Sequence, residues 1–136
     1  MKHTLLFLLM ICACTLQATA TGKQPRLTDD ELMTLVQKQT FRYFWDFAHP
    51  ESGLARERSN DRLEIATIGG SGFGVMAIIV GVERGFITRE QGAERLLKIV
   101  EFLNKADSYH GIWAHWMDGA TGKTIPFSRK DDGADL

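Results

Sequence analysis

The chain has 136 residues, of which 44% are hydrophobic and 24% charged, and its formal net charge is -1 at pH 7. This composition is that of an ordinary globular protein and excludes disordered and collagen-like chains. The nearly balanced charge offers no basic field for nucleic acid or anionic lipid, so neither is an expected partner.

The N-terminal segment predicts a secretory signal peptide. Lys2 and His3 form a weakly basic start, and residues 4–15 are almost wholly apolar but too short to span a bilayer. The small residues Ala18 and Ala20 fit signal-peptidase cleavage after Ala20. We therefore expect residues 1–20 to be removed and the protein to be exported, with a buried N-terminal helix as the alternative.

Both cysteines lie inside this segment, so the mature chain would carry neither a thiol nor a disulfide. The stretch Ile11-Cys12-Ala13-Cys14 also resembles a loose bacterial lipoprotein box, in which Cys14 is the lipidated residue. Lipidation would anchor the protein to a bacterial membrane without spanning it. We expect a free periplasmic or extracellular protein, with lipid anchoring at Cys14 as the alternative.

A first helix is predicted from Thr28 to about Ala48, after a polar linker at residues 21–27. Thr28 and Glu31 form a capping box, and Pro50 prevents the helix from continuing. The apolar residues that recur at helical spacing are Leu32, Leu35, Val36, Tyr43, Phe44 and Phe47.

The next segments predict a long loop and then a buried helix. Residues 50–64 are polar, and structureless loops of this length are often functional. Residues 72–84 are apolar nearly all round and precede Gly85, which favours a helix buried on every side, although a buried strand is the alternative. We expect the missing neighbours of this helix to lie beyond residue 136.

A third, amphipathic helix is predicted over residues 89–106, capped by Thr88 and Gln91. A small β-hairpin then follows, with residues 112–117 and 124–127 as strands and a Gly-containing turn between them. The last acidic residues look like the first turn of a further helix. The fold class that we predict is all-α with this hairpin near the C-terminus.

The residues that carry chemistry cluster at the C-terminal end. Aromatic rings offer flat apolar faces on which sugars stack, and glycoside cleavage needs two carboxyl groups, one of which protonates the leaving oxygen. The aspartates near the end of this sequence could supply those carboxyl groups, but they equally suit the first turn of a plain helix. The four histidines show no H-x-x-x-H spacing, so neither a transition metal nor another cofactor is expected. The cluster comprises Trp113, His115 and Trp116, followed by Asp131, Asp132 and Asp135.

Three stretches resemble the glucoamylase-like (glycoamylase) family, which includes endo-β-1,2-glucanases. They are residues 65–74 (IATIGGSGFG), residues 81–88 (GVERGFIT) and most of residues 115–136, from HWMD to DDGADL. The stretches agree in order, and the resemblance covers roughly residues 28–136. It implies that residues 28–136 are the N-terminal part of a truncated domain of this family.

The resemblance also implies a partial (α/α) toroid of about three helices, in which residues 72–84 form an inner helix and residues 89–106 an outer one. Aspartates matching Asp131 to Asp135 are thought to contribute to the family's pocket, and a further glutamate role falls on positions absent here. We expect Asp135 to be catalytic. The supporting residues are Asp131 or Asp132, with Trp113, His115, Trp116, Arg56 and Arg58 binding the sugar.

The function implied is hydrolysis of a β-glucan, of the β-1,2 type, by carboxylate acid/base catalysis when the protein is complete. The chain alone is expected to be inactive. A non-catalytic exported sugar-binding protein and an inactive truncated remnant are the alternatives. An oligosaccharide or polysaccharide is therefore the expected partner.

Overall fold

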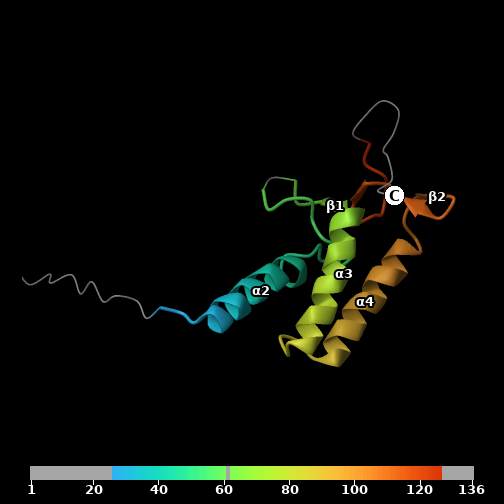
Figure 1. The fold of residues 1–136 in the computed structure, drawn as a ribbon. Coiled ribbons are helices and arrows are strands. Elements are labelled where there is room, and N and C mark those ends of the chain that lie inside the picture. Colours follow the sequence, from blue (N-terminus) through green and yellow to red (C-terminus); the bar gives the residue numbers. More distant parts are fainter. Residues whose placement is uncertain (1–25, 61, 127–136) are drawn as a thin grey trace, which may run out of the picture.

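A computed structural model describes residues 26–60 and 62–126. In this part of the chain the protein is mostly helical, with three helices and a small antiparallel strand part. Helices α3 and α4 lie side by side, α2 packs on α3 with its N-terminal end pointing away from the pair, and the strands gather at the end opposite the α3–α4 turn (Figure 1). The elements are α2 (Asp29–Trp45), β1 (Ile65–Thr67), α3 (Ile68–Glu83), α4 (Arg89–Leu103), β2 (Ser108–Tyr109), β3 (Ile112–Trp113) and β4 (Trp116–Asp118).

The two predicted capping boxes are confirmed. In α2 the Thr28 hydroxyl accepts the Glu31 backbone N–H at 3.3 Å, and the Glu31 carboxylate accepts the Thr28 N–H at 2.8 Å. Thr88 and Gln91 form the same pair at the start of α4. Each box satisfies backbone donors that a helix start leaves without partners, which is why both boundaries follow from local sequence.

Helix α3 begins at Ile68 rather than at Gly72, where the sequence predicts it. Its start has no side-chain cap and is fixed by contacts with distant segments. The Ser71 hydroxyl donates to the Thr67 carbonyl at 2.6 Å and accepts the Ala55 N–H at 3.0 Å. The Ile68 N–H donates to the His115 carbonyl at 3.1 Å. These tertiary bonds compensate for the low helix propensity of the glycines in the first turn.

Within the described residues this helix is closed on one face only, and the expectation that further neighbours cover the rest stays a prediction. One face is closed, because Gly74 and Gly81 let the rings of Phe44 and Phe41 approach the helix backbone. The other face is open: Phe73 is 73% exposed and Met76 60%. Only α2 and α4 pack on α3 along its length, so the described residues supply neighbours for part of its circumference.

The predicted hairpin at residues 112–127 is confirmed in part, because Met117 bridges to Thr124 and the Ile125 N–H donates to the Trp116 carbonyl at 3.0 Å. Strand β4 also pairs with β1, which the sequence does not predict. A separate hairpin joins β2 to β3 through His110 and Gly111, both with positive φ. Strand β1 has three residues, too few for an alternating pattern to identify it.

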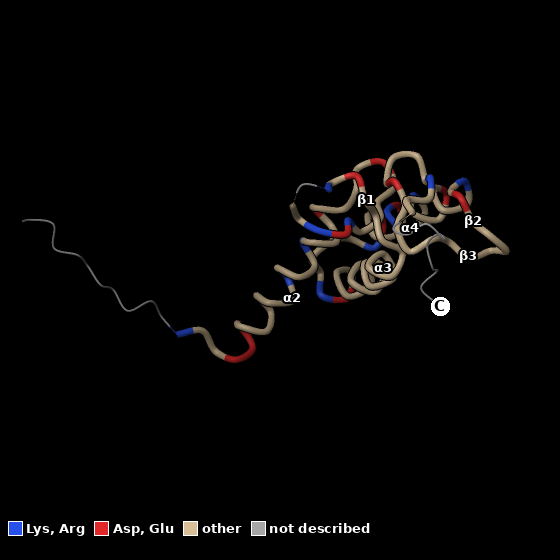
Figure 2. The backbone as a smooth tube through the Cα atoms, turned by 90° about the horizontal axis from the view of Figure 1, so that it is seen from above, with Lys and Arg blue, Asp and Glu red and all other residues tan. Residues whose placement is uncertain are grey.

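The core lies where the loop before β1, the β1–β4 pair and the three helices meet. Figure 2 shows that α3, whose only charged residue is Glu83, lies among segments in which acidic and basic residues are interspersed. No described helix has the length and apolar character needed to cross a membrane. The core cluster is Phe41, Leu54, Ala66, Ile78, Ile87, Ile99 and Met117.

Candidate carbohydrate site

The candidate site is built on a row of four backbone segments at the strand end of the molecule. Arg56 bridges to Ala66 of β1, Ala66 pairs with Met117 of β4, and Met117 bridges to Thr124. Ala66 and Met117 are 0% and 1% exposed, so the middle of this row is sealed. The row joins the loop that carries the predicted arginines to the strand that carries the predicted aromatic residues.

The two predicted arginines differ in their surroundings. Arg56 is half-buried, and its guanidinium lies 4.7 Å from the centre of the Phe47 ring. Its backbone carbonyl accepts the Tyr43 hydroxyl at 2.9 Å. Arg58 is 60% exposed at the side chain and lies 3.6 Å from Glu57. Arg56 is thus held in place by packing, whereas Arg58 lies on the surface.

Burial raises the pKa of Tyr43, and the charge of Glu57 adds to this while that of Arg56 opposes it. Tyr43 is therefore a neutral hydroxyl donor over the whole physiological range. Its hydrogen bond ties the end of α2 to the Arg56 segment.

The three predicted aromatic ligands are all half-buried. The Trp113 indole N–H donates to the Leu103 carbonyl at 3.1 Å, which ties β3 to the end of α4. The rings of His115 and Trp116 lie 5.6 Å apart at an angle of 44°. Because neighbours on a strand point to opposite faces, Trp116 and Met117 face opposite ways, and Arg56 shares the Met117 side. The structure thus groups His115 with Trp116 but does not place Arg56 beside Trp116.

The predicted catalytic residues Asp131, Asp132 and Asp135 lie outside the described residues, as does Cys14. Residues 1–20 and most of the predicted linker lie outside them as well. All of these assignments stay predictions.

Asp118 organises the turn that follows β4. One of its carboxylate oxygens accepts hydrogen bonds from the Ala120 N–H at 3.1 Å and from the N–H and hydroxyl of Thr121, both at 2.8 Å. Burial raises the pKa of Asp118, but these hydrogen bonds outweigh it and leave the pKa below its ordinary value. The carboxylate is ionised at neutral pH and keeps the turn closed.

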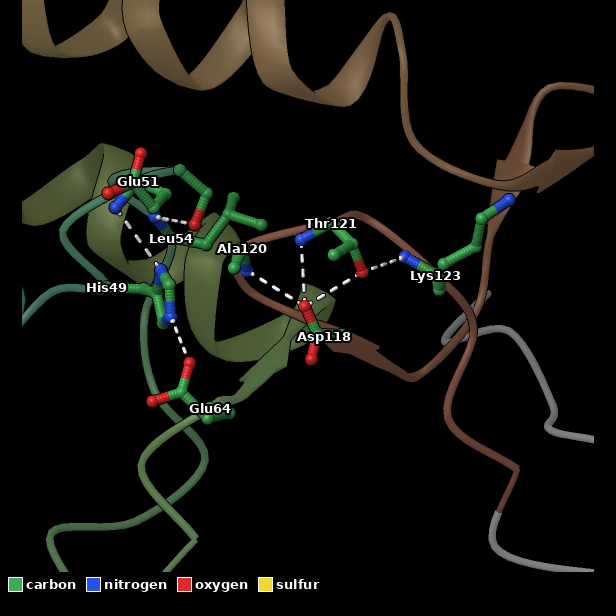
Figure 3. A network of polar contacts seen from close by, with 9 residues as sticks. His49, Glu51, Leu54, Glu64, Asp118, Ala120, Thr121 and Lys123 are labelled. Carbon is green, nitrogen blue, oxygen red and sulfur yellow. Dashed lines mark hydrogen bonds and ion pairs between the residues drawn. The ribbon is translucent and has the colours of Figure 1, made fainter.

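A buried histidine links this turn to the loop before β1. The His49 ring is 2% exposed and lies 3.0 Å from the Glu64 carboxylate, as Figure 3 shows beside the Asp118 turn. Sequence reasoning considers His49 only as a metal ligand and treats residues 118–122 only as a turn. No local pattern connects the two, because the contact joins residues far apart in the chain.

Chemically, the half-buried rings of His115 and Trp116 are groups that suit a neutral polar ligand such as a sugar, whereas Arg56 lies on the opposite side of the strand row. Among the described residues, no group of three or more His, Cys, Asp and Glu side chains could hold a metal ion.

No protein-family model matches the chain. Over 111 residues it is 54% identical to an exo-β-1,2-glucooligosaccharide sophorohydrolase (non-reducing end) of Parabacteroides distasonis, which covers 81% of this chain. A glucoamylase-like protein of Bacteroides uniformis, known from a crystal structure, is 83% identical over 81% of this chain, with a TM-score of 0.77. An endo-β-1,2-glucanase from Chitinophaga pinensis, solved with sophorotriose and glucose, is 56% identical over 81% of this chain, with the same TM-score.

The chain spans only a small part of each relative. It covers 15% of the length of the sophorohydrolase, 27% of the Bacteroides uniformis protein and 28% of the Chitinophaga pinensis enzyme. The resemblance inferred from the sequence is confirmed: the homologues and structural neighbours of this chain are glucoamylase-like proteins and β-1,2-glucan hydrolases, to a part of which the chain corresponds.

Proposed function

We propose that this chain is part of an exported glycoside hydrolase that cleaves β-1,2-glucan. One observation carries the proposal: relatives at 54% and 56% identity are a β-1,2-glucooligosaccharide sophorohydrolase and an endo-β-1,2-glucanase. These two enzymes differ in where they cut but share the linkage. The common substrate class is therefore the part of their function that this chain can inherit from both.

The complete fold proposed is an (α/α) toroid, of which α3 is an inner helix and α4 an outer one. The open face of α3 supports this arrangement, because large apolar patches on a soluble protein mark surfaces that pack against something else. Further helices of a longer protein would cover Phe73 and Met76, which this chain leaves 73% and 60% exposed.

In the proposed mechanism two carboxyl groups share the work of glycoside cleavage. Asp135 is the first candidate, with Asp131 or Asp132 assisting. Asp131 and Asp135 are four positions apart, which would put them on one face of a helix, and the repulsion between two such carboxylates would raise one pKa, as suits a general acid. Trp113, His115 and Trp116 would line the sugar site, and of the two predicted arginines the exposed Arg58 would be the one free to reach it, because Arg56 packs on Phe47.

The test uses the longest natural protein that contains this sequence, incubated with linear β-1,2-glucan. We expect new reducing ends, and the product sizes separate the two modes of cutting. Sophorose alone indicates release from a chain end, whereas a ladder of longer oligosaccharides indicates internal cleavage.

Asp135→Asn tests the assignment of the acid. We expect hydrolysis to fall by about 10²–10⁴-fold, because a positioned acid or base contributes that much. Glu101→Gln is the control, since it removes a carboxylate from an exposed position on α4. Wild-type rates in Asp135→Asn overturn the assignment, and saturable glucan binding without any hydrolysis favours a sugar-binding protein.

Export is proposed from the N-terminal segment alone. Mass spectrometry of the mature protein distinguishes a free exported protein from one that is lipidated at Cys14. An N-terminus at Thr21 fits cleavage after Ala20, whereas a lipidated N-terminus at Cys14 fits membrane anchoring. An intact Met1 overturns both.

A further inference from the structure

His49 occupies a junction between three segments of the chain. It follows the end of α2, and both of its ring nitrogens form hydrogen bonds. Nδ1 lies 3.3 Å from the Glu51 backbone nitrogen, whose N–H can only donate, so Nδ1 is the acceptor. Nε2 therefore carries the proton and donates it to the Glu64 carboxylate at 3.0 Å. A ring with both nitrogens engaged has one orientation and is not available to a ligand.

The turn after β4 rests directly on this ring. A Cβ on Gly119 would lie 2.5 Å from Cδ2 and Cγ of His49, so only glycine allows the turn to come this close. The Gly119 N–H also donates to the Glu64 carbonyl at 2.8 Å. Glu64 is thus held on two sides, by its side chain to His49 and by its backbone to Gly119.

The backbone of His49 holds the loop that leads to the arginines. The backbone N–H of His49 donates to the Leu54 carbonyl, and the Gly53 N–H donates to the backbone carbonyl of His49, both at 2.8 Å. Leu54 is 0% exposed and lies two residues before Arg56. His49 therefore contacts the loop that carries Arg56, the residue that precedes β1, and the turn that closes β4 (Figure 3).

We propose that His49 is a positioning residue of the carbohydrate site. The imidazole bonds to Glu64 and to the Glu51 N–H and packs against Gly119, so it sets how closely the turn after β4 approaches this junction and thereby positions β4, which carries Trp116. The inference rests on the proposed function, because the site it serves is the glucan site. His49 itself does not touch the sugar, since its ring is sealed and its nitrogens are occupied.

The first experiment asks whether β4 depends on His49, without using activity. We compare His49→Leu with His49→Gln, whose amide can still donate to Glu64. In ¹H–¹⁵N spectra of the full chain we expect His49→Leu to shift the Trp116 indole and the backbone amides of β4, while those of α4 stay in place. His49→Gln should restore most of the wild-type positions.

Two milder variants keep the test decisive where His49→Leu does not fold. Gly119→Ala should shift the same β4 signals, because its methyl group pushes the turn away from the ring. Glu64→Gln changes a side chain that is 69% exposed, so folding should survive while the bond to His49 weakens. Glu101→Gln on α4 is the matched control and should leave β4 unchanged. Shifts spread evenly over the chain, or none in β4, overturn the proposal.

The second experiment measures hydrolysis in the longest natural protein that contains this sequence. We expect His49→Leu to raise the KM for β-1,2-glucan by roughly tenfold or more with a smaller loss of kcat, because a small misplacement of binding groups is costly. His49→Gln should return KM most of the way. A purely structural role predicts lower thermal stability with unchanged KM below the melting temperature, and that result overturns the proposal.

The two experiments separate this inference from the proposed function. If the wild-type protein does not hydrolyse or bind β-1,2-glucan, the proposed function fails. The spectra then show whether His49 positions β4 at all. Unchanged β4 signals in a protein that does hydrolyse the glucan overturn the positioning role alone.

Discussion

The two faces of α3 are both apolar, but one is buried against other segments of the chain and the other is exposed. On the closed face Ile78 is 1% exposed, and Gly74 and Gly81 lie against the rings of α2. On the open face Phe73 and Met76 are 73% and 60% exposed. Gly74 and Gly81 therefore lie where this chain supplies a neighbour, and Phe73 and Met76 project where it supplies none.

The contrast teaches that apolarity alone does not locate the contacts of a helix. A helix without a polar face needs neighbours all round, but it does not say which of them the same chain provides. At Gly74 and Gly81 the missing Cβ marks the contact, because a side chain there would meet the rings of Phe44 and Phe41, whereas Gly72 has no such neighbour. The closed face continues into the strand end of the molecule, where Leu54, Ala66 and Met117 are almost fully buried.

The largest loss of stability should come from a substitution in the buried strands, at the end of the molecule where β1 and β4 pair. Met117 is 1% exposed, so Met117→Ala should lower the free energy of unfolding by about 2–5 kcal/mol through lost contacts and a cavity. Met76→Ala on the open face is the matched control and should change it by at most about 0.5 kcal/mol. Urea unfolding of both variants measures the difference, and equal losses would break the comparison between the two regions.

Two glycines on α3 should respond with opposite signs. Gly81→Ala would place a methyl group in the Phe41 ring, which is 5% exposed and packed against Trp45 and Phe86, and should cost about 1–3 kcal/mol. Gly72 has nothing within 4 Å of such a methyl group. Gly72→Ala should therefore stabilise the chain by about 0.5–1 kcal/mol, because alanine favours a helix. Thermal melts of the pair decide, and a stabilising Gly81→Ala contradicts the closed face.

Acid should weaken the strand end through Asp118. Its pKa is lowered in the folded chain by hydrogen bonds from Thr121 and Ala120, which outweigh burial, and the unfolded value is about 3.9. The stabilisation is therefore complete above the unfolded pKa and is lost as pH falls through the folded one. Urea midpoints measured from about pH 6 to pH 2.5 should fall less for Asp118→Asn than for wild type. Identical pH profiles would show that the turn does not depend on the charge.

What the sequence predicts well is local. The capping boxes at Thr28 and Thr88 place α2 and α4, because each box is formed by residues three apart. The aromatic cluster around Trp116 is equally visible, since its members are neighbours in the chain. The family resemblance adds the likeness to β-1,2-glucan hydrolases, which the relatives confirm.

The features that cannot be predicted from the sequence are those fixed by contacts between residues far apart in the chain. The sequence predicts this helix from residue 72, yet the bonds of Ser71 to Thr67 and Ala55 bring Gly69 and Gly70 into α3. Strand β4 pairs with β1, some fifty residues earlier, as well as bridging to the next segment. His49 carries no local signal of its bond to Glu64. These features need the fold before they can be recognised.

The smallest effect in this chain should come from Phe73, the most exposed large side chain on α3. Phe73→Ala should change the free energy of unfolding by at most about 0.5 kcal/mol, because the ring contributes little to the packing of the described residues. In a longer protein whose further helices cover this face, the same substitution should cost about 3–5 kcal/mol, as for a buried ring. Parallel urea titrations of the two proteins measure the change in cost. A small cost in both would mean that the open face stays open, which contradicts the proposed toroid, whereas a large cost only in the longer protein identifies α3 as one of its inner helices.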